Sequence, residues 1–230
     1  MTNKSKKTTL NGLGSVASPE LVALGGSVRS LVDAMLRIDD APDELERARA
    51  QLDVIAERLA TSARSSDALR LGRDDEPEDA RPYFIDGVML PPYHPLAADF
   101  EIQTEDAVTT GSVTFGVVFE GPPGCVHGAH VAGFFDQILG CHNLALGLPA
   151  MTASLSVQYR RPTPLFTRLL FEVRIREQKG RKVTVRGALR DGDGVVAEAD
   201  GLFVLPNSGI TRDLGQIVRE PSRSTPRGRS

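Results

Sequence analysis

The stretch GAHVAGFFDQILGCHNLAL, residues 128–146, decides the fold class of this chain. A Pro-Pro-Gly sequence at 122–124 precedes it and Gly147 and Pro149 follow it, so the pattern predicts one long helix. Apolar side chains occupy most of the circumference of this helix. A helix that is apolar nearly all round is enclosed by other structure, and we expect a curled sheet to wrap around it.

Twofold alternation of apolar residues on both sides of the helix predicts the strands of that sheet. The alternating sets are Val113, Phe115, Val117 and Phe119, then Leu155, Val157 and Tyr159, then Leu169, Phe171, Val173 and Ile175. Asp191-Gly-Asp-Gly194 separates two further apolar stretches and predicts a hairpin turn. Several strands around one helix indicate an α+β fold.

Two amphipathic helices are expected before the strands. Ser18 and Pro19 are typical of a helix start, as are Asp40 and Pro42, and each pair is followed by apolar residues at steps of three and four. The predicted organisation is a disordered N-terminus (1–17), a helical extension (18–64), an acidic linker (65–81), the strand-rich domain (82–206) and a disordered basic tail (207–230).

Composition excludes several classes of protein. The 230 residues carry a formal net charge of −3, which supplies no positive field for a nucleic-acid backbone. The two cysteines cannot form the dense disulfide framework of small secreted domains. The sequence has neither a signal-peptide core nor an apolar run of membrane-spanning length. We therefore expect a cytoplasmic protein that neither binds nucleic acid nor spans a membrane.

Asp136 is the one carboxylate in the apolar helix. Burial of an unpaired charge is costly, so this residue is expected to be paired, hydrogen-bonded or functional. Its neighbours three and four residues away include Ala132, Gly133 and Gly140, and such small side chains would let another molecule or another chain come close. The alternative is an ordinary solvated Asp on a polar helix face.

The start of the same helix is the second candidate for chemistry. Backbone amides at a helix N-terminus lack intrahelical partners, so the Gly128 N–H can stabilise an oxyanion. Gly128 and Asp136 are eight residues apart, about 12 Å along the axis at ~1.5 Å per residue, and one carbonyl cannot contact both. If both serve one reaction, they come from different chains, which predicts an active site at a symmetric homodimer interface.

The stretch EGPPGCVHGAHVAGFFD at 120–136, with Thr152 and QYRRP at 158–162, resembles the PaaI-like and THEM-type hotdog-fold acyl-CoA thioesterases. The similarity extends over about residues 82–206. In these proteins His-Gly-Gly begins the hotdog helix and an Asp follows nine residues after the His. His127 and Asp136 have the same spacing.

The resemblance implies a hotdog fold, dimers joined edge to edge or pairs of such dimers, and acyl-CoA bound between protomers. It implies that Asp136 acts as general base or nucleophile, that the Gly128 amide is the oxyanion donor and that Thr152 holds the water or the carboxylate. His127 either orients the loop, donates to the thioester carbonyl or is only a packed histidine at a helix start. No cofactor and no metal are expected.

Two positions depart from the family pattern. The second Gly of His-Gly-Gly is Ala129, followed by His130, so the loop is bulkier and the acyl channel is expected to differ in shape. Some relatives place an Asn a few residues before the His-Gly, whereas this chain has Gly121 followed by two prolines. Substrate choice therefore does not follow from the resemblance.

Clustered cations suit the phosphates of CoA, since they combine charge with several hydrogen-bond donors. The candidates are Arg160, Arg161, Arg181 and Lys182.

Two other functions stay open at this point. The first is a non-catalytic acyl-CoA binding protein of the same fold, because a fold does not guarantee activity. The second is a zinc or redox site, because residue types that ligate zinc gather around the helix. These residues are Cys125, His127, His130, Cys141 and His142.

Overall fold

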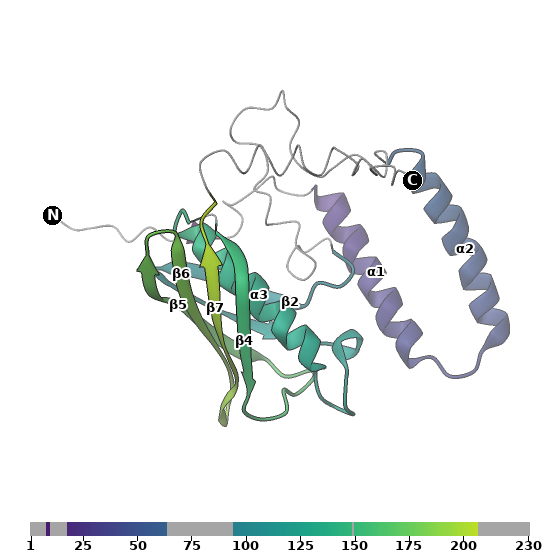
Figure 1. The fold of residues 1–230 in the computed structure, drawn as a ribbon. Helices are drawn as coiled ribbons and strands as arrows, with labels where there is room; N and C mark the ends of the chain where they lie inside the picture. The colour runs from purple at the N-terminus through teal and green to yellow at the C-terminus, as the bar shows by residue number, and fades with distance from the viewer. Residues whose placement is uncertain (1–7, 10–17, 64–93, 149, 207–230) are drawn as a thin grey trace, which may run out of the picture.

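The computed structural model describes residues 8–9, 18–63, 94–148 and 150–206 (Figure 1). The helices are α1 (Pro19–Arg37), α2 (Pro42–Ala60), the 3-10 helix η2 (Val117–Phe119) and α3 (Gly128–Ala145). The strands are β1 (Thr8–Thr9), β2 (Asp99–Glu105), β3 (Val108–Thr114), β4 (Met151–Tyr159), β5 (Leu169–Lys179), β6 (Lys182–Asp191) and β7 (Gly194–Val204). The expected linker at 65–81 and tail at 207–230 lie outside the described residues, as do 82–93.

The strands form one antiparallel sheet in the order β1-β2-β3-β5-β6-β7-β4. The predicted hairpin turn joins β6 to β7, where the Asp193 N–H donates to Asp191 Oδ1 at 2.8 Å and Gly194 has a φ of 123°. Only glycine adopts such a φ without strain. Strand β4 enters the sheet after α3 and pairs with β7, so that β4 forms one edge of the sheet.

Helix α3 packs against β4, β5, β6 and β7, and the core lies between them (Figure 1). Phe134, Phe135, Ile138 and Leu139 are fully buried there. Glycines in the sheet allow the helix to come this close. A Cβ on Gly187 would lie 3.1 Å from side-chain atoms of Leu139 and Phe135. The predicted α+β architecture, an antiparallel sheet wrapped on one long helix and preceded by two helices, is confirmed.

Helix α1 begins where the sequence predicts, because the Ser18 side chain accepts a hydrogen bond from the Leu21 N–H at 3.2 Å. It packs against η2, and Arg29 Nη1 donates to the His94 carbonyl at 3.1 Å. Helix α2 has no buried residue and lies farther from the sheet than α1 does (Figure 1). Within the described ranges, no helix has the length and apolar character needed to cross a membrane.

One local prediction needs correction. The strand expected to continue through Val117 and Phe119 ends at Thr114, and the chain then turns into η2. Phe115 and Phe119 both face the core, with their ring centroids 5.3 Å apart. The turn therefore buries the same two apolar residues that a strand would have buried. Strand β2 was not predicted. Thr8–Thr9, in a stretch for which no order was expected, pairs with β2.

Candidate active site

The start of α3 presents a free backbone amide. His127, the N-cap residue, has φ −62° and ψ 135°, and its Nδ1 accepts a hydrogen bond from the Ala129 N–H at 3.1 Å. The His127 N–H donates to the Phe119 carbonyl at 2.8 Å. In the described part of the chain the Gly128 N–H has no hydrogen-bond partner. It is therefore available to an acceptor beyond the described residues, at the positive end of the helix dipole.

The loop before His127 is closed by its own hydrogen bonds. The Gly124 N–H donates to Glu120 Oε1 at 2.8 Å, and the Gly121 N–H donates to the Cys125 carbonyl at 2.9 Å. A Cβ on Gly121 would lie 2.7 Å from His127 Cα, closer than real side chains approach. Position 121 therefore has no room for a side chain.

His127 and His130 lie side by side, with ring centroids 6.1 Å apart. Burial lowers the pKa of His130, and the nearby positive charge that His127 can carry lowers it further. His130 also contacts the edge of the Phe119 ring. Because Nδ1 of His127 is an acceptor, a neutral His127 ring carries its proton on Nε2, on an exposed side chain.

Asp136 is hydrogen-bonded to Thr152. Thr152 Oγ1 donates to Asp136 Oδ1 at 2.8 Å, across from α3 to β4. The carboxylate is half-buried and lies on the one face of α3 that the sheet does not cover, together with the half-exposed Ala132, Gly133 and Gly140. The small residues thus flank the carboxylate on an open helix face.

Asp136 and Thr152 are hydrogen-bonded to each other, but neither lies close to Gly128 of the same chain. The helical rise alone separates Gly128 from Asp136 by about 12 Å. Helix α3 crosses β4 in the opposite direction, because Gly128 contacts Tyr159 at the end of the strand and Asp136 contacts Thr152 near its beginning. One chain therefore presents the two candidate groups at opposite ends of the same strand.

Tyr159 is a site residue that sequence reasoning missed. Its hydroxyl donates to the Gly128 carbonyl at 2.8 Å, and its ring lies 3.4 Å from where a Cβ on residue 128 would be. In the sequence it continues the apolar alternation of its strand and stands in the QYRRP stretch, but neither pattern gives it a role. The feature of the sequence that could have pointed to Tyr159 is its position at the end of that strand, just before two arginines.

The four predicted phosphate-binding cations fall into two groups. Arg160 and Arg161 follow Tyr159, and they pair with Glu198 at 2.9 Å and Asp191 at 2.7 Å. The other two lie at the far end of β4, because Lys182 is opposite Val204, which is opposite Met151. Arg181 Nε donates to the Leu205 carbonyl at 2.7 Å. One chain does not bring the four cations together.

The residues proposed for a zinc or redox site are also separated. Cys141 and His142 are buried in the second half of α3, far from the loop that carries Cys125 and His127. Burial raises the pKa of the Cys141 thiol to about 12 and lowers the pKa of His142 to about 4. His142 Nδ1 is hydrogen-bonded to Thr109 Oγ1 at 2.7 Å. Among described residues, no group of three His, Cys, Asp or Glu is arranged to hold a metal.

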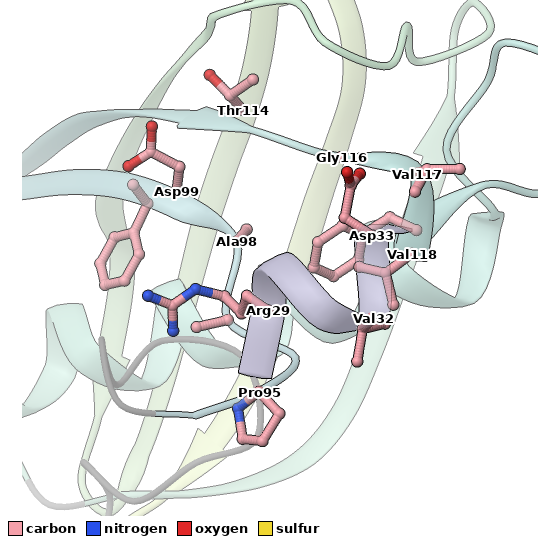
Figure 2. A pocket seen from close by; sticks show the side chains of 13 residues that line it. Arg29, Val32, Asp33, Pro95, Ala98, Asp99, Thr114, Gly116, Val117 and Val118 are labelled. Carbon is pink, nitrogen blue, oxygen red and sulfur yellow. The ribbon is translucent and has the colours of Figure 1, made fainter. Parts of the chain in front are cut away.

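A cavity of about 450 Å³ lies between α1, the start of β2 and η2 (Figure 2). Figure 2 shows Arg29, Val32 and Asp33 of α1 at this cavity, beside Val117 and Val118. None of the predicted site residues lines it. It adjoins the site loop only through Phe119, whose carbonyl binds the His127 N–H.

Comparisons with known proteins agree on one superfamily. Residues 123–198 match the family model described as Thioesterase superfamily. The crystal structure of RHA08564, a thioesterase superfamily protein, is 34% identical with a TM-score of 0.73, and the match covers 88% of this chain and 98% of that one. Residues 94–206 make up less than half of this chain, so the match includes part of the N-terminal extension.

Curated relatives match a shorter stretch. Acyl-coenzyme A thioesterase THEM4 of Xenopus laevis is 34% identical over 91 residues, or 39% of this chain and 41% of the relative. The Mus musculus protein of the same name is 32% identical over 91 residues, or 39% of each chain. This chain therefore spans about two fifths of the length of these relatives.

Proposed function

Because the chain belongs to the thioesterase superfamily, we propose that it hydrolyses acyl-CoA thioesters at a site shared by two copies of the chain. One copy supplies the Gly128 amide and the other supplies Asp136. The observation that carries the proposal is that Gly128 and Asp136 lie at opposite ends of β4, where the Tyr159 hydroxyl donates to the Gly128 carbonyl and the Thr152 hydroxyl donates to the Asp136 carboxylate. The oligomer is a homodimer or a dimer of such dimers.

The edge strand β4 supports the pairing of two copies. It is nine residues long, seven of its side chains are exposed, and within the described ranges no strand other than β7 pairs with it. A long uncovered edge strand readily pairs with another chain. The small residues beside Asp136 would let the two α3 helices approach each other across the same interface.

The register of such a pair brings the two halves of the site together. The bulge between Thr152 and Ser154 puts Thr152 at the register step that residue 153 would otherwise occupy, so an antiparallel pair of β4 strands centred on Ser156 has Thr152 opposite Tyr159 of the partner subunit. Tyr159 contacts Gly128 and Thr152 contacts Asp136 within each chain. The pairing therefore places the Asp136 of one copy near the Gly128 amide of the other, twice per dimer.

The chemistry follows from these positions. Thr152 occupies Oδ1 of Asp136, which leaves Oδ2 to take a proton from an attacking water. The water oxygen forms a bond to the thioester carbonyl carbon, and the Gly128 N–H stabilises the negative charge that develops on the carbonyl oxygen. The C–S bond then breaks, and CoA leaves as the thiol after it takes up the proton. The products are the free acid and CoA.

The same pairing accounts for the cations that one chain keeps apart. Arg160 and Arg161 lie at the Gly128 end of β4, and Arg181 and Lys182 lie at the Asp136 end. In the dimer, the first two from one copy and the last two from the other flank one crevice. We assign them to the phosphates of CoA, with the exposed Nε2–H of His127 as a second donor near the carbonyl.

The test is the release of free thiol from a panel of acyl-CoAs by the full chain and by Asp136→Asn. The proposal predicts turnover of at least one acyl-CoA by the wild type and a loss of about 10²- to 10⁴-fold in kcat for the variant. Tight acyl-CoA binding without turnover by either protein would instead identify a non-catalytic acyl-CoA binder.

A further inference from the structure

Tyr159 contacts the first turn of α3 in two ways. Its hydroxyl donates to the Gly128 carbonyl at 2.8 Å. Its Cζ and its hydroxyl oxygen both lie 3.4 Å from the place a Cβ on residue 128 would occupy, so the ring packs against the glycine backbone. The side chain is nevertheless 52% exposed, which is unusual for a ring that serves only to fill a core.

The backbone conformation of Gly128 has to be fixed if its N–H is to keep one direction. Glycine has the largest backbone freedom of all residues, and the first turn of a helix has unpaired amides and frays easily. The His127 N–H donates to the Phe119 carbonyl and the Ala129 N–H donates to His127 Nδ1, so the residues on either side are fixed. The peptide that carries the Gly128 N–H is held at its other end, where the His127 carbonyl accepts from the His130 N–H at 2.9 Å. The bond from Tyr159 ties Gly128 itself to the sheet.

We propose that Tyr159 is a positioning residue that holds Gly128 so that its N–H points at the thioester carbonyl. This inference rests on the proposed function of the Gly128 amide. Strand β4 then fixes both halves of the reaction, since Thr152 at its start holds the acid and Tyr159 at its end holds the oxyanion donor. Thr152 and Tyr159 are seven residues apart on one rigid strand, so their Cα atoms are at most about 23 Å apart at ~3.3 Å per residue.

The experiment compares Tyr159→Phe with the wild type. The variant keeps the ring that packs on Gly128 and removes only the hydroxyl. Thr184→Val, which deletes a hydroxyl from β6 away from the site, is the matched control. A displaced oxyanion donor still gives part of the transition-state stabilisation that a deleted donor would remove. We therefore expect kcat to fall about 10- to 50-fold in Tyr159→Phe, with KM within about twofold of the wild type. Thr184→Val should keep the wild-type kcat.

A second readout separates this inference from the proposed function. In ¹⁵N–¹H spectra of the full chain, Tyr159→Phe should shift the Gly128 and Ala129 amide resonances and speed hydrogen exchange at them, while Thr184→Val leaves them in place. These shifts are expected whether or not an acyl-CoA is turned over. A wild-type kcat in Tyr159→Phe, or unmoved Gly128 and Ala129 amides, would overturn the positioning role. An inactive wild type with shifted amides would overturn only the proposed reaction.

Discussion

Replacement of Gly128 by proline removes the proposed oxyanion donor and little else. Proline has no N–H, and the first position of a helix tolerates it, because that amide has no intrahelical partner. The residue before a proline must be extended, and His127 already has φ −62° and ψ 135°. The matched control is Gly128→Ala, which keeps the N–H and adds a Cβ 3.4 Å from the Tyr159 ring, an ordinary contact distance.

The expected loss follows from the geometry of the donor. Loss of one oxyanion-hole amide lowers kcat about 10²- to 10³-fold, or about 3–4 kcal/mol of transition-state stabilisation. Because the ground-state thioester carbonyl carries little charge, KM should change much less than kcat. Gly128→Ala should stay within about threefold of the wild type, since the N–H remains.

The assay is steady-state release of CoA thiol, with thermal unfolding of each variant measured beside it. A folded Gly128→Pro protein whose kcat is within about threefold of that of Gly128→Ala would refute the role of this amide. A parallel loss in both variants would also refute it, because the added Cβ and not the missing N–H would then be responsible.

Three further outcomes follow from the same structure. Gly121→Ala should lower the free energy of unfolding by about 1–3 kcal/mol in urea titrations and reduce kcat, because its Cβ would lie 2.7 Å from His127 Cα; unchanged values would contradict the closed loop. The pKa of His142 is about 4 in the folded chain and ~6.5 when unfolded, so protonation favours the unfolded state. At a fixed protein concentration, the free energy of unfolding should therefore fall by about 2 kcal/mol from pH 7 to pH 5. His142→Gln should remove this contribution to the pH dependence. Iodoacetamide at pH 8 should modify Cys125 and spare Cys141, whose pKa of about 12 keeps it a buried thiol; mass spectrometry that finds Cys141 modified first would contradict this.

The central helix could be predicted from the sequence because its signals are local. Apolar residues at a helical period, with prolines and glycines at each end, specify α3 without knowledge of its neighbours. The single carboxylate among them is equally visible. The predicted boundary differs from the observed one by a single residue, at Leu146.

The rest of the fold and of the site depends on contacts between distant residues. Strand β4 follows α3 in the sequence, yet it pairs with β7, and no local pattern specifies that pairing. The bond from Tyr159 to Gly128 ends on a backbone carbonyl, which any residue at 128 would supply, so it leaves no mark on the sequence. The spacing of Phe115 and Phe119 also fits both a strand and a turn, and here the turn forms.

The contact between Thr152 and Asp136 was expected from the family resemblance and not from the sequence pattern. The role of Thr152 beside Asp136 was implied by the resemblance to hotdog thioesterases, and the structure places the two side chains 2.8 Å apart. Spacing in the sequence alone, sixteen residues with a helix end and a loop between, does not predict that contact. The sequence offered the cations as two separate pairs of candidates, and it could not show that the pairs lie at opposite ends of β4.

Subunit mixing tests the shared site most directly. Gly128→Pro and Asp136→Asn are each expected to be nearly inactive, and the two proteins are unfolded together and refolded in equal amounts. If the amide and the carboxylate come from different chains, each mixed dimer has one intact site, and because half of the dimers are mixed, about a quarter of the wild-type activity should return. If the site lies within one chain, every site keeps one lesion, and no activity above that of the separate variants would appear.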